Sequence, residues 1–486
     1  MEKYLLPRLQ SVIYFSIFCA VLIIGPRTFN LDGDLGRHIT IGNYILDNYS
    51  IPTNDFFSFP MNGQPLTPHE WLAQVIFALA NRGMSLGGPV FVIAFLIGIT
   101  FSFIYIDSVR RSQMPLLFLL FIVWSAAASS LHWLARPHIF TFLFLALWTH
   151  LLEQIEQGKK IPVYCFGFLM VIWANTHGGF VIGFVVLFAY TIGDLLESWF
   201  QNQKLSDKAK NWVWIGIISF ASTLINPVGI RLWGTSVGFI GNSYLVNNTQ
   251  EYFSPNFHNI STLPFLVLVA YSLLATGICK NRIAIYYGLL LSGFTVMALY
   301  SSRNIPLYAI VAAPILTKMT GQWIENSSWQ RLEQNILHIE KRLYGWLFPI
   351  VGTIAVLILM LTPVMKTYNS YNEMVFPVKA MDWLQENPIE GRGFNYFTWG
   401  GYLLFRQWPD QLVFIDGQTD FYGEKLTREY EQVINMSDGW EQVLEKYQIR
   451  WIVLPTKSPL LVELSQKMEW SIRYQDMTAT LISLDE

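Results

Sequence analysis

The residues best suited to chemistry are Asp32, Asp34 and His38, which follow a hydrophobic segment at residues 12–24 within the run DGDLGRHITIGNYIL. Ionised side chains this close to a membrane are energetically costly and are usually functional. If a helix begins at Asp34, then Asp34 and His38 lie at i and i+4 on one face of it. Either aspartate would also suit the role of helix cap, and that role is compatible with a catalytic one.

A second acidic site follows in the same loop, where Pro68, His69 and Glu70 precede the apolar stretch WLAQVIFALANRG. Glu70 facing the first pair would supply a metal ligand or a hydrogen-bond acceptor for a sugar hydroxyl. It would equally suit the first turn of a helix, whose dipole favours an acidic residue. No second histidine completes an H-E-x-x-H zinc pattern, and no Cys-x-x-Cys spacing occurs. The sequence assigns no cofactor and leaves only a divalent metal open.

Basic residues occupy matching positions: Arg136 and His138 begin one hydrophobic segment, His177 lies in the turn NTHGG, and Arg303 lies in the turn SSRN. A guanidinium group stays charged and binds phosphate in a bidentate way. Snorkelling to lipid headgroups is the other role open to Arg136 and Arg303. Six of the eight histidines map to the same edge of the hydrophobic segments, which predicts a polar cavity there; the six are His38, His69, His132, His138, His177 and His258.

Membrane helices must position these residues. The chain has 486 residues, of which 52% are hydrophobic and 14% are charged, against about 25% charged residues in soluble globular proteins. A net charge of −2 gives no sign of nucleic-acid binding. The three cysteines lie in or beside hydrophobic segments, where we expect packing roles.

Eleven segments are predicted to span a membrane. They lie near residues 10–25, 87–107, 114–132, 137–153, 161–175, 178–198, 211–227, 263–279, 283–300, 306–319 and 342–362.

Charge asymmetry predicts the orientation of these segments. Up to residue 365, every lysine falls in one set of loops, whereas the cations of the other set are all arginine: Arg27, Arg37, Arg82, Arg136, Arg231 and Arg303. Positive loops stay in the cytoplasm. The N-terminus is then cytoplasmic, and the first loop, residues 26–86, faces outward from a plasma or inner membrane. The stretch after Glu70 is too short for a span and is predicted to be an interfacial helix.

The last part of the chain has the composition of a soluble protein. Helical patterns alternate there with strand patterns, the latter in GFNYF, GGYLLF, LVFIDG, RWIVLP, SIRYQD and TATLISL. We therefore predict an all-α polytopic membrane domain over residues 1–365, followed by a small soluble, extracytoplasmic α/β domain over residues 366–486. The acidic run DGQTD at residues 416–420 follows a predicted strand, where such runs can bind sugars or metals. It is interpreted as a structural turn, because no glycine-rich phosphate loop or histidine accompanies it.

The first loop resembles that of GT-C-type glycosyltransferases, the superfamily of protein O-mannosyltransferases, aminoarabinose transferases and oligosaccharyltransferases. The resemblance rests on Asp32, Asp34, PTND at residues 52–55 and PHEWL at residues 68–72. With GGYLLF and VFIDGQTDFYG added, the chain is more closely similar to uncharacterised bacterial membrane proteins near that superfamily. It departs from the mannosyltransferases in having Asp-Gly-Asp instead of Asp-Glu and Pro-His-Glu instead of Glu-Lys-Pro-Pro. It also lacks the Trp-Trp-Asp motif of oligosaccharyltransferases, so neither sugar nor acceptor is implied.

The resemblance implies an inverting glycosyltransferase that moves a sugar from a polyprenyl-phosphate donor to an acceptor hydroxyl at the outer leaflet. Carboxylates would provide the general base and orient it, while basic residues would bind sugar and offset the charge of the departing phosphate. The predicted catalytic residues are Asp32, Asp34 and Glu70, and the predicted substrate-binding residues are His38, His69, Arg136, His138, His177 and Arg303. The expected partners are a lipid-linked sugar donor and membrane lipids; the oligomeric state is not indicated.

Two non-enzymatic functions stay open at this stage. A transporter or flippase for lipid-linked glycans would also need polar groups within a helical bundle, and an assembly factor would use its C-terminal domain to bind a partner. Transporters often contain internal repeats and place their polar residues near the bilayer midplane. This sequence shows no internal repeat, and its polar residues gather at one edge, which favours an enzyme.

Overall fold

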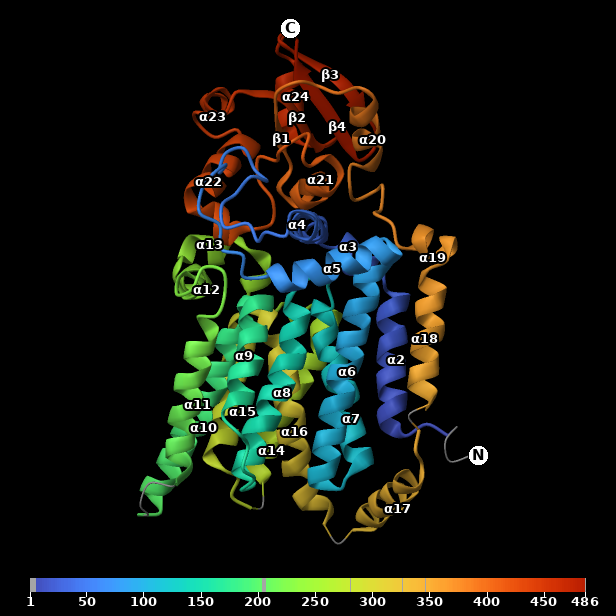
Figure 1. The fold of residues 1–486 in the computed structure, drawn as a ribbon, viewed down its shortest axis with the longest axis vertical. Helices are drawn as coiled ribbons and strands as arrows, with labels where there is room; N and C mark the ends of the chain where they lie inside the picture. The colour runs from blue at the N-terminus through green and yellow to red at the C-terminus, as the bar shows by residue number, and fades with distance from the viewer. Residues whose placement is uncertain (1–5, 203–206, 280, 326, 346, 486) are drawn as a thin grey trace.

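The structure is a computed structural model that describes residues 6–202, 207–279, 281–325, 327–345 and 347–485. Each of the eleven predicted spans contains a helix, and these helices run side by side along the long axis of the molecule (Figure 1). They are α2 (Leu9–Ile23), α6 (Gly87–Ser112), α7 (Pro115–Ser129), α8 (His138–Glu156), α9 (Tyr164–Thr176), α10 (Val181–Phe200), α11 (Asp207–Thr223), α14 (Leu263–Ile278), α15 (Ile285–Tyr300), α16 (Ile305–Ile324) and α18 (Leu347–Met360).

The helices differ in their capacity to cross a bilayer. Among the described residues, five helical segments are long and apolar enough by themselves, and a sixth results if α18 and the preceding α17 (Ser328–Arg342) form one bent span. The helices α2, α9 and α15 are apolar but shorter. The chain is thus a multi-pass membrane protein, and the number of about eleven spans stays a prediction.

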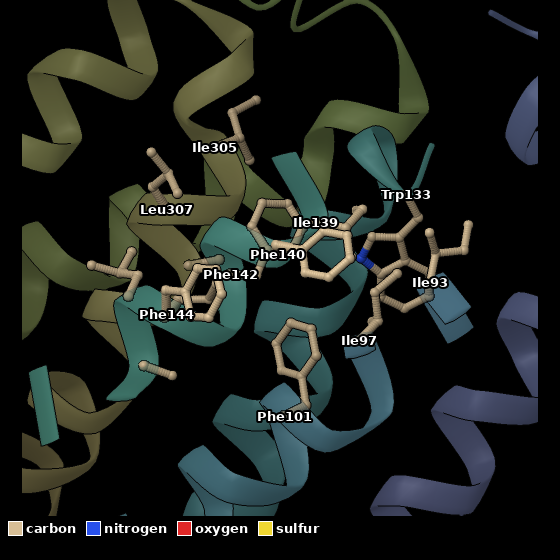
Figure 2. Packing of buried hydrophobic residues seen from close by; sticks show 14 of the residues in the cluster. Ile93, Ile97, Phe101, Trp133, Ile139, Phe140, Phe142, Phe144, Ile305 and Leu307 are labelled. Carbon is tan, nitrogen blue, oxygen red and sulfur yellow. The ribbon is translucent and has the colours of Figure 1, made fainter. Parts of the chain in front are cut away.

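Large apolar side chains hold the bundle together. Figure 2 shows Ile93, Ile97 and Phe101 of α6 beside Trp133 and Phe140, all of which are buried. Lipid tails are as apolar as these side chains, so close packing stabilises such a bundle more than removal from water does. The polar edge of Trp133 is satisfied too, because its indole N–H donates to the Ser129 hydroxyl at 3.0 Å.

A layer of short helices crosses one end of the bundle. It comprises α3 (Arg27–Asn30), α4 (Asp34–Asn48) and α5 (Trp71–Met84), which lie between the bundle and the C-terminal residues in Figure 1. The helix predicted after Glu70 is α5, and it begins at the next residue. Two further short helices, α12 (Arg231–Gly241) and α13 (Ser243–Asn248), lie at the same end.

The C-terminal residues form a small mixed sheet flanked by helices. The strand order is β1-β2-β4-β3, with β1 (Arg392–Asn395) parallel to β2 (Ile449–Pro455), and with β4 (Ala479–Leu484) antiparallel to both β2 and β3 (Trp470–Gln475). The described helices of this part are α20 (Val378–Glu386), α21 (Gly400–Gln407), α22 (Thr419–Ile434), α23 (Trp440–Lys446) and α24 (Pro459–Ser465). The predicted α/β character is therefore present.

Two of the predicted strands are wrong. The run GGYLLF lies within helix α21, and LVFIDG does not join the sheet. Residue Val413 pairs instead with the first loop: its N–H donates to the Phe57 carbonyl at 3.3 Å, and its carbonyl accepts from Phe59 N–H at 3.2 Å. The strand pattern of this run was real, but its partner comes from a segment more than 350 positions earlier in the chain.

Helix α21 packs directly on helix α4, and glycines make the close approach possible. A Cβ atom on Gly36 would lie 2.2 Å from the Gly401 carbonyl oxygen, and one on Gly401 would lie 2.3 Å from the Gly33 carbonyl oxygen. Real side chains do not fit at such distances. The C-terminal part is thereby held against the segment that carries Asp32 and Asp34.

Candidate active site

The two aspartates of the first loop lie at the start of α4. Asp34 is the first residue of the helix and Gly33 is its N-cap, so neither aspartate takes the N-cap position. Asp32 nevertheless accepts the backbone N–H of Asp34 at 3.1 Å, which fixes its carboxylate. Both side chains are buried. Gly417 approaches Asp34 closely from the other side, since a Cβ atom added to this glycine would lie only 1.8 Å from Asp34 Oδ1.

Arg136 gathers three carboxylates. Its guanidinium donates to both oxygens of Asp32, one of them at 2.5 Å, and to Glu251 Oε1 at 2.5 Å. It also lies 3.2 Å from Asp34 Oδ2. Charge-assisted, bidentate pairs of this kind are strong and directional. Arg136 therefore positions the aspartates, and within the described residues its donors are already engaged.

Arg303 has fewer charged partners than Arg136. It donates to the Tyr252 hydroxyl at 2.7 Å and lies 3.9 Å from Glu251 Oε2. Its side chain is 34% exposed, against 23% for Arg136. Arg303 is thus the more available of the two predicted phosphate ligands.

A second cation, Arg37, joins the first loop to the C-terminal part. Its Nη1 donates to Gln418 Oε1 at 2.9 Å, and it lies 3.7 Å from Glu70 Oε2 and 3.8 Å from Asp416 Oδ1. The run DGQTD, interpreted from the sequence as a structural turn, is therefore part of the candidate site. The neighbouring residue Asp420 lies 4.0 Å from the His69 ring.

Three of the predicted site histidines have close partners within the protein. His38 lies 3.7 Å from Glu70, but burial and then the Arg37 cation lower the pKa of His38 well below its usual value. His138 Nε2 lies 2.8 Å from the His132 carbonyl, so this nitrogen carries the proton. His177 Nδ1 accepts the Gly179 N–H at 3.0 Å and lies 2.9 Å from the Thr141 hydroxyl.

One cavity of about 1060 Å³ unites these residues. It lies where the end of the bundle, the short helices and the C-terminal part meet. All nine side chains predicted as site residues line it, namely Asp32, Asp34, His38, His69, Glu70, Arg136, His138, His177 and Arg303. Of the six histidines predicted at this edge, His132 contributes its carbonyl to His138, and His258 is exposed away from the lining.

Several residues that line the cavity were not predicted as site residues. Arg37 was predicted only as an outer cation and Glu251 was not singled out, while Tyr396 and Phe397 belong to a predicted strand and Gln418 to a predicted turn. The position of Arg37 three residues after Asp34, on the same helix face, was the available signal. Tyr396 and Phe397 follow strand β1, and no sequence pattern ties them to the first loop.

Burial and ion pairing set the charge states of the carboxylates. Burial raises the pKa of Asp32 to about 6, against the opposing effect of Arg136. Burial likewise raises the pKa of Asp416 to about 6, although Arg37 lowers it in part. Burial also acts to raise the pKa of Glu251, but Arg136 and Arg303 outweigh it and bring that pKa down to about 2. These three carboxylates are therefore ionised above about pH 7.

The arrangement does not preassemble a metal site. Within the part of the chain that the structure describes, no three His, Cys, Asp or Glu side chains are grouped so as to hold a metal ion. The carboxylates nearest the cavity are instead engaged by Arg37 and Arg136.

Comparison with known proteins identifies the architecture. No family model matches the sequence, and no curated protein does. The oligosaccharyltransferase AglB of Archaeoglobus fulgidus, solved with an inhibitory peptide and a dolichol-phosphate, is similar with a TM-score of 0.60 at 13% identity over 92% of this chain and 69% of that protein. ArnT of Cupriavidus metallidurans, solved with undecaprenyl phosphate, is similar with a TM-score of 0.50 at 13% identity over 97% of both chains. Both are GT-C-type glycosyltransferases, and the chain shares their GT-C fold.

Proposed function

We propose that the protein is a membrane glycosyltransferase that moves a sugar from a polyprenyl-phosphate donor to an acceptor hydroxyl. The observation that carries this proposal is the cavity in which the acidic pair, the half-buried Arg136 that pairs with it and the less occupied Arg303 meet. The similar structures AglB and ArnT hold a dolichol-phosphate and an undecaprenyl phosphate, respectively, which supports a lipid phosphate as part of the donor.

Asp34 is the proposed general base. Asp32 is saturated by Arg136 and by the first N–H of α4, so it acts as a positioning residue. Asp34 is somewhat more exposed to the cavity, at 11% against 5% for Asp32. Glu70 and His69 line the same cavity as Asp34, and we propose that they bind sugar hydroxyls there. A carboxylate held rigidly beside the acceptor avoids reorganisation in the transition state.

The proposed reaction is a single displacement. The acceptor oxygen attacks the anomeric carbon of the sugar, and its proton passes to Asp34. The bond between that carbon and the phosphate oxygen breaks, and its electron pair leaves with the polyprenyl phosphate. Attack opposite the leaving group inverts the anomeric configuration. Arg303 offsets the growing charge on the phosphate, as fixed cations do best where they face the developing charge.

Substitution of Arg303 by lysine tests the phosphate site. Lysine keeps the charge but loses the planar fork, and one lost charge-assisted hydrogen bond costs about 1.5 kcal/mol. We expect Arg303→Lys to raise the Kd for undecaprenyl phosphate by roughly tenfold, measured on the purified protein in nanodiscs. Arg82→Lys is the matched control, because Arg82 is an outer arginine whose partner is the exposed Asp47. Equal Kd values for Arg303→Lys and Arg82→Lys would assign Arg303 to headgroup anchoring.

Membrane orientation is a second test, because the proposal requires the cavity to face outward. Lysines in one loop set predict a cytoplasmic N-terminus and an extracytoplasmic domain over residues 366–486. Cysteines introduced at Asn202 and Ser370, both exposed, should react with an impermeant maleimide from opposite sides of the membrane. Labelling of both from one side would contradict the proposed orientation.

Cellular lipids provide the direct test of the function. Cells that lack the protein should accumulate one polyprenyl-phosphate sugar, and the parent gene should reverse this accumulation while an Asp34→Asn gene should not. Mass spectrometry of extracted lipids measures the species and its sugar. Identical lipid-linked sugars in all three strains would argue against a transferase.

A further inference from the structure

Glu251 occupies the space between two arginines that face the cavity. Its carboxylate bonds Arg136 at 2.5 Å through Oε1 and lies 3.9 Å from Arg303 through Oε2. It lines the same cavity as Asp34 and His138. A carboxylate placed between two guanidiniums has the charge and the bidentate oxygen geometry that a phosphate would present there.

The residues around Arg136 already carry more negative than positive charge, which disfavours the binding of a further anion. Three carboxylates, Asp32, Asp34 and Glu251, surround Arg136, and Arg303 adds a second cation beside Glu251. Arg37 also acts on Asp34, but its charge is shared with Asp416 and Glu70. A sugar phosphodiester adds a negative charge, and the lipid monophosphate released by transfer carries about −1.5 to −2. Binding either one here requires that one of the carboxylates withdraw.

Glu251 is the carboxylate best placed to withdraw. Asp32 is held by the backbone N–H of Asp34 and by two bonds from Arg136, and Asp34 is the first residue of α4, on which α21 packs. The backbone of Glu251 is anchored instead: its carbonyl accepts the hydroxyls of Ser301 and Ser302 at 3.0 and 3.1 Å. Rotation of the Glu251 side chain can therefore vacate the arginines without moving the chain.

We propose that Glu251 is an internal stand-in for phosphate, which holds Arg136 and Arg303 in place when no lipid phosphate is bound and is displaced when one binds. This inference rests on the proposed lipid-phosphate donor. Its consequence is kinetic as well as structural. Glu251 weakens the binding of the donor, but it also helps to expel the lipid phosphate product, because its carboxylate returns to the arginines.

The test compares Glu251→Gln with the parent protein in nanodiscs, with undecaprenyl phosphate as the titrant. Glutamine keeps the size of the side chain but removes the competing charge, so we expect the Kd to fall by about tenfold, a factor equal to about 1.4 kcal/mol. Glu424→Gln is the charge-matched control. Glu424 is on α22, pairs with Arg428 and does not line the cavity, so its Kd should equal that of the parent.

Glu251→Asp is a second variant that tests the same inference if Glu251→Gln fails to fold. Aspartate keeps the charge but draws it back from Arg136, so its Kd should lie between those of the parent and Glu251→Gln. An unchanged or higher Kd in both Glu251 variants, with the parent still preferring undecaprenyl phosphate to undecaprenol, would overturn this inference and leave the donor site intact. A parent that does not distinguish the phosphate from the alcohol would overturn the proposed function and this inference together.

Discussion

Asp34→Asn should abolish sugar transfer while leaving the protein folded. Loss of a general base costs about 10²–10⁴ in rate, and asparagine cannot accept the acceptor proton. The fold should persist because Arg136 keeps Asp32 and Glu251 as partners and because the amide has the size of the carboxylate. Turnover of a radiolabelled polyprenyl-phosphate sugar, measured beside the melting temperature, checks both halves of the prediction.

Asp47→Asn provides the matched control for this variant. Asp47 lies on the same helix α4, but its side chain is exposed and pairs with the likewise exposed Arg82. Its substitution should change neither rate nor stability measurably, as exposed ion pairs contribute about 0–1 kcal/mol. If Asp34→Asn turned over as fast as Asp47→Asn, Asp34 would be no base.

Asp32→Asn separates positioning from proton transfer. Asp32 accepts hydrogen bonds from Nε and Nη2 of Arg136 and from the backbone N–H of Asp34, so its loss should lower both the rate and the melting temperature. Asp34→Asn should lower the rate alone. The reverse pattern would exchange the proposed roles of the two aspartates.

The membrane helices and the first-loop carboxylates could be predicted from sequence because their signals are local. A run of about 20 apolar residues is visible in any window, and charges directly beside such a run stand out. The nine predicted site residues share one cavity for the same reason. All but His38, which lies within α4, were placed by an end of a hydrophobic segment, and the arginine and histidine bias placed those ends on one side.

The parts that sequence reasoning missed depend on contacts distant in the chain. Asp416 and Gln418 enter the site only because α21 packs on α4 and because Arg37 reaches across that interface. The strand-like run around Val413 finds its partner at Phe57 and Phe59, not in the sheet. Neither composition nor periodicity records which distant segment a run will meet, so the turn interpretation of DGQTD followed from local pattern alone.

The close packing of α21 on α4 predicts a second substitution with a large effect on sugar transfer. Gly401→Ala should eliminate transfer although Gly401 contacts no reacting group. The added Cβ would lie 2.3 Å from the Gly33 carbonyl oxygen, so α21 and α4 must separate. Overpacking of this kind costs about 1–3 kcal/mol, and a displacement of about 1 Å at a catalytic group can cost roughly 10²-fold in rate. The neighbouring Asp34 and Gly417 would lose their close contact.

Lipid binding distinguishes a displaced α4–α21 interface from general unfolding of the Gly401→Ala protein. Arg303 belongs to the bundle end and not to the α4–α21 interface, so Gly401→Ala should keep the parent's Kd for undecaprenyl phosphate while losing turnover. Gly83→Ala is the control, because a Cβ there meets no atom within 4 Å; both properties should be unchanged. Full turnover in Gly401→Ala would show that the C-terminal part does not position Asp34. Loss of lipid binding together with turnover would instead indicate that the whole protein had unfolded.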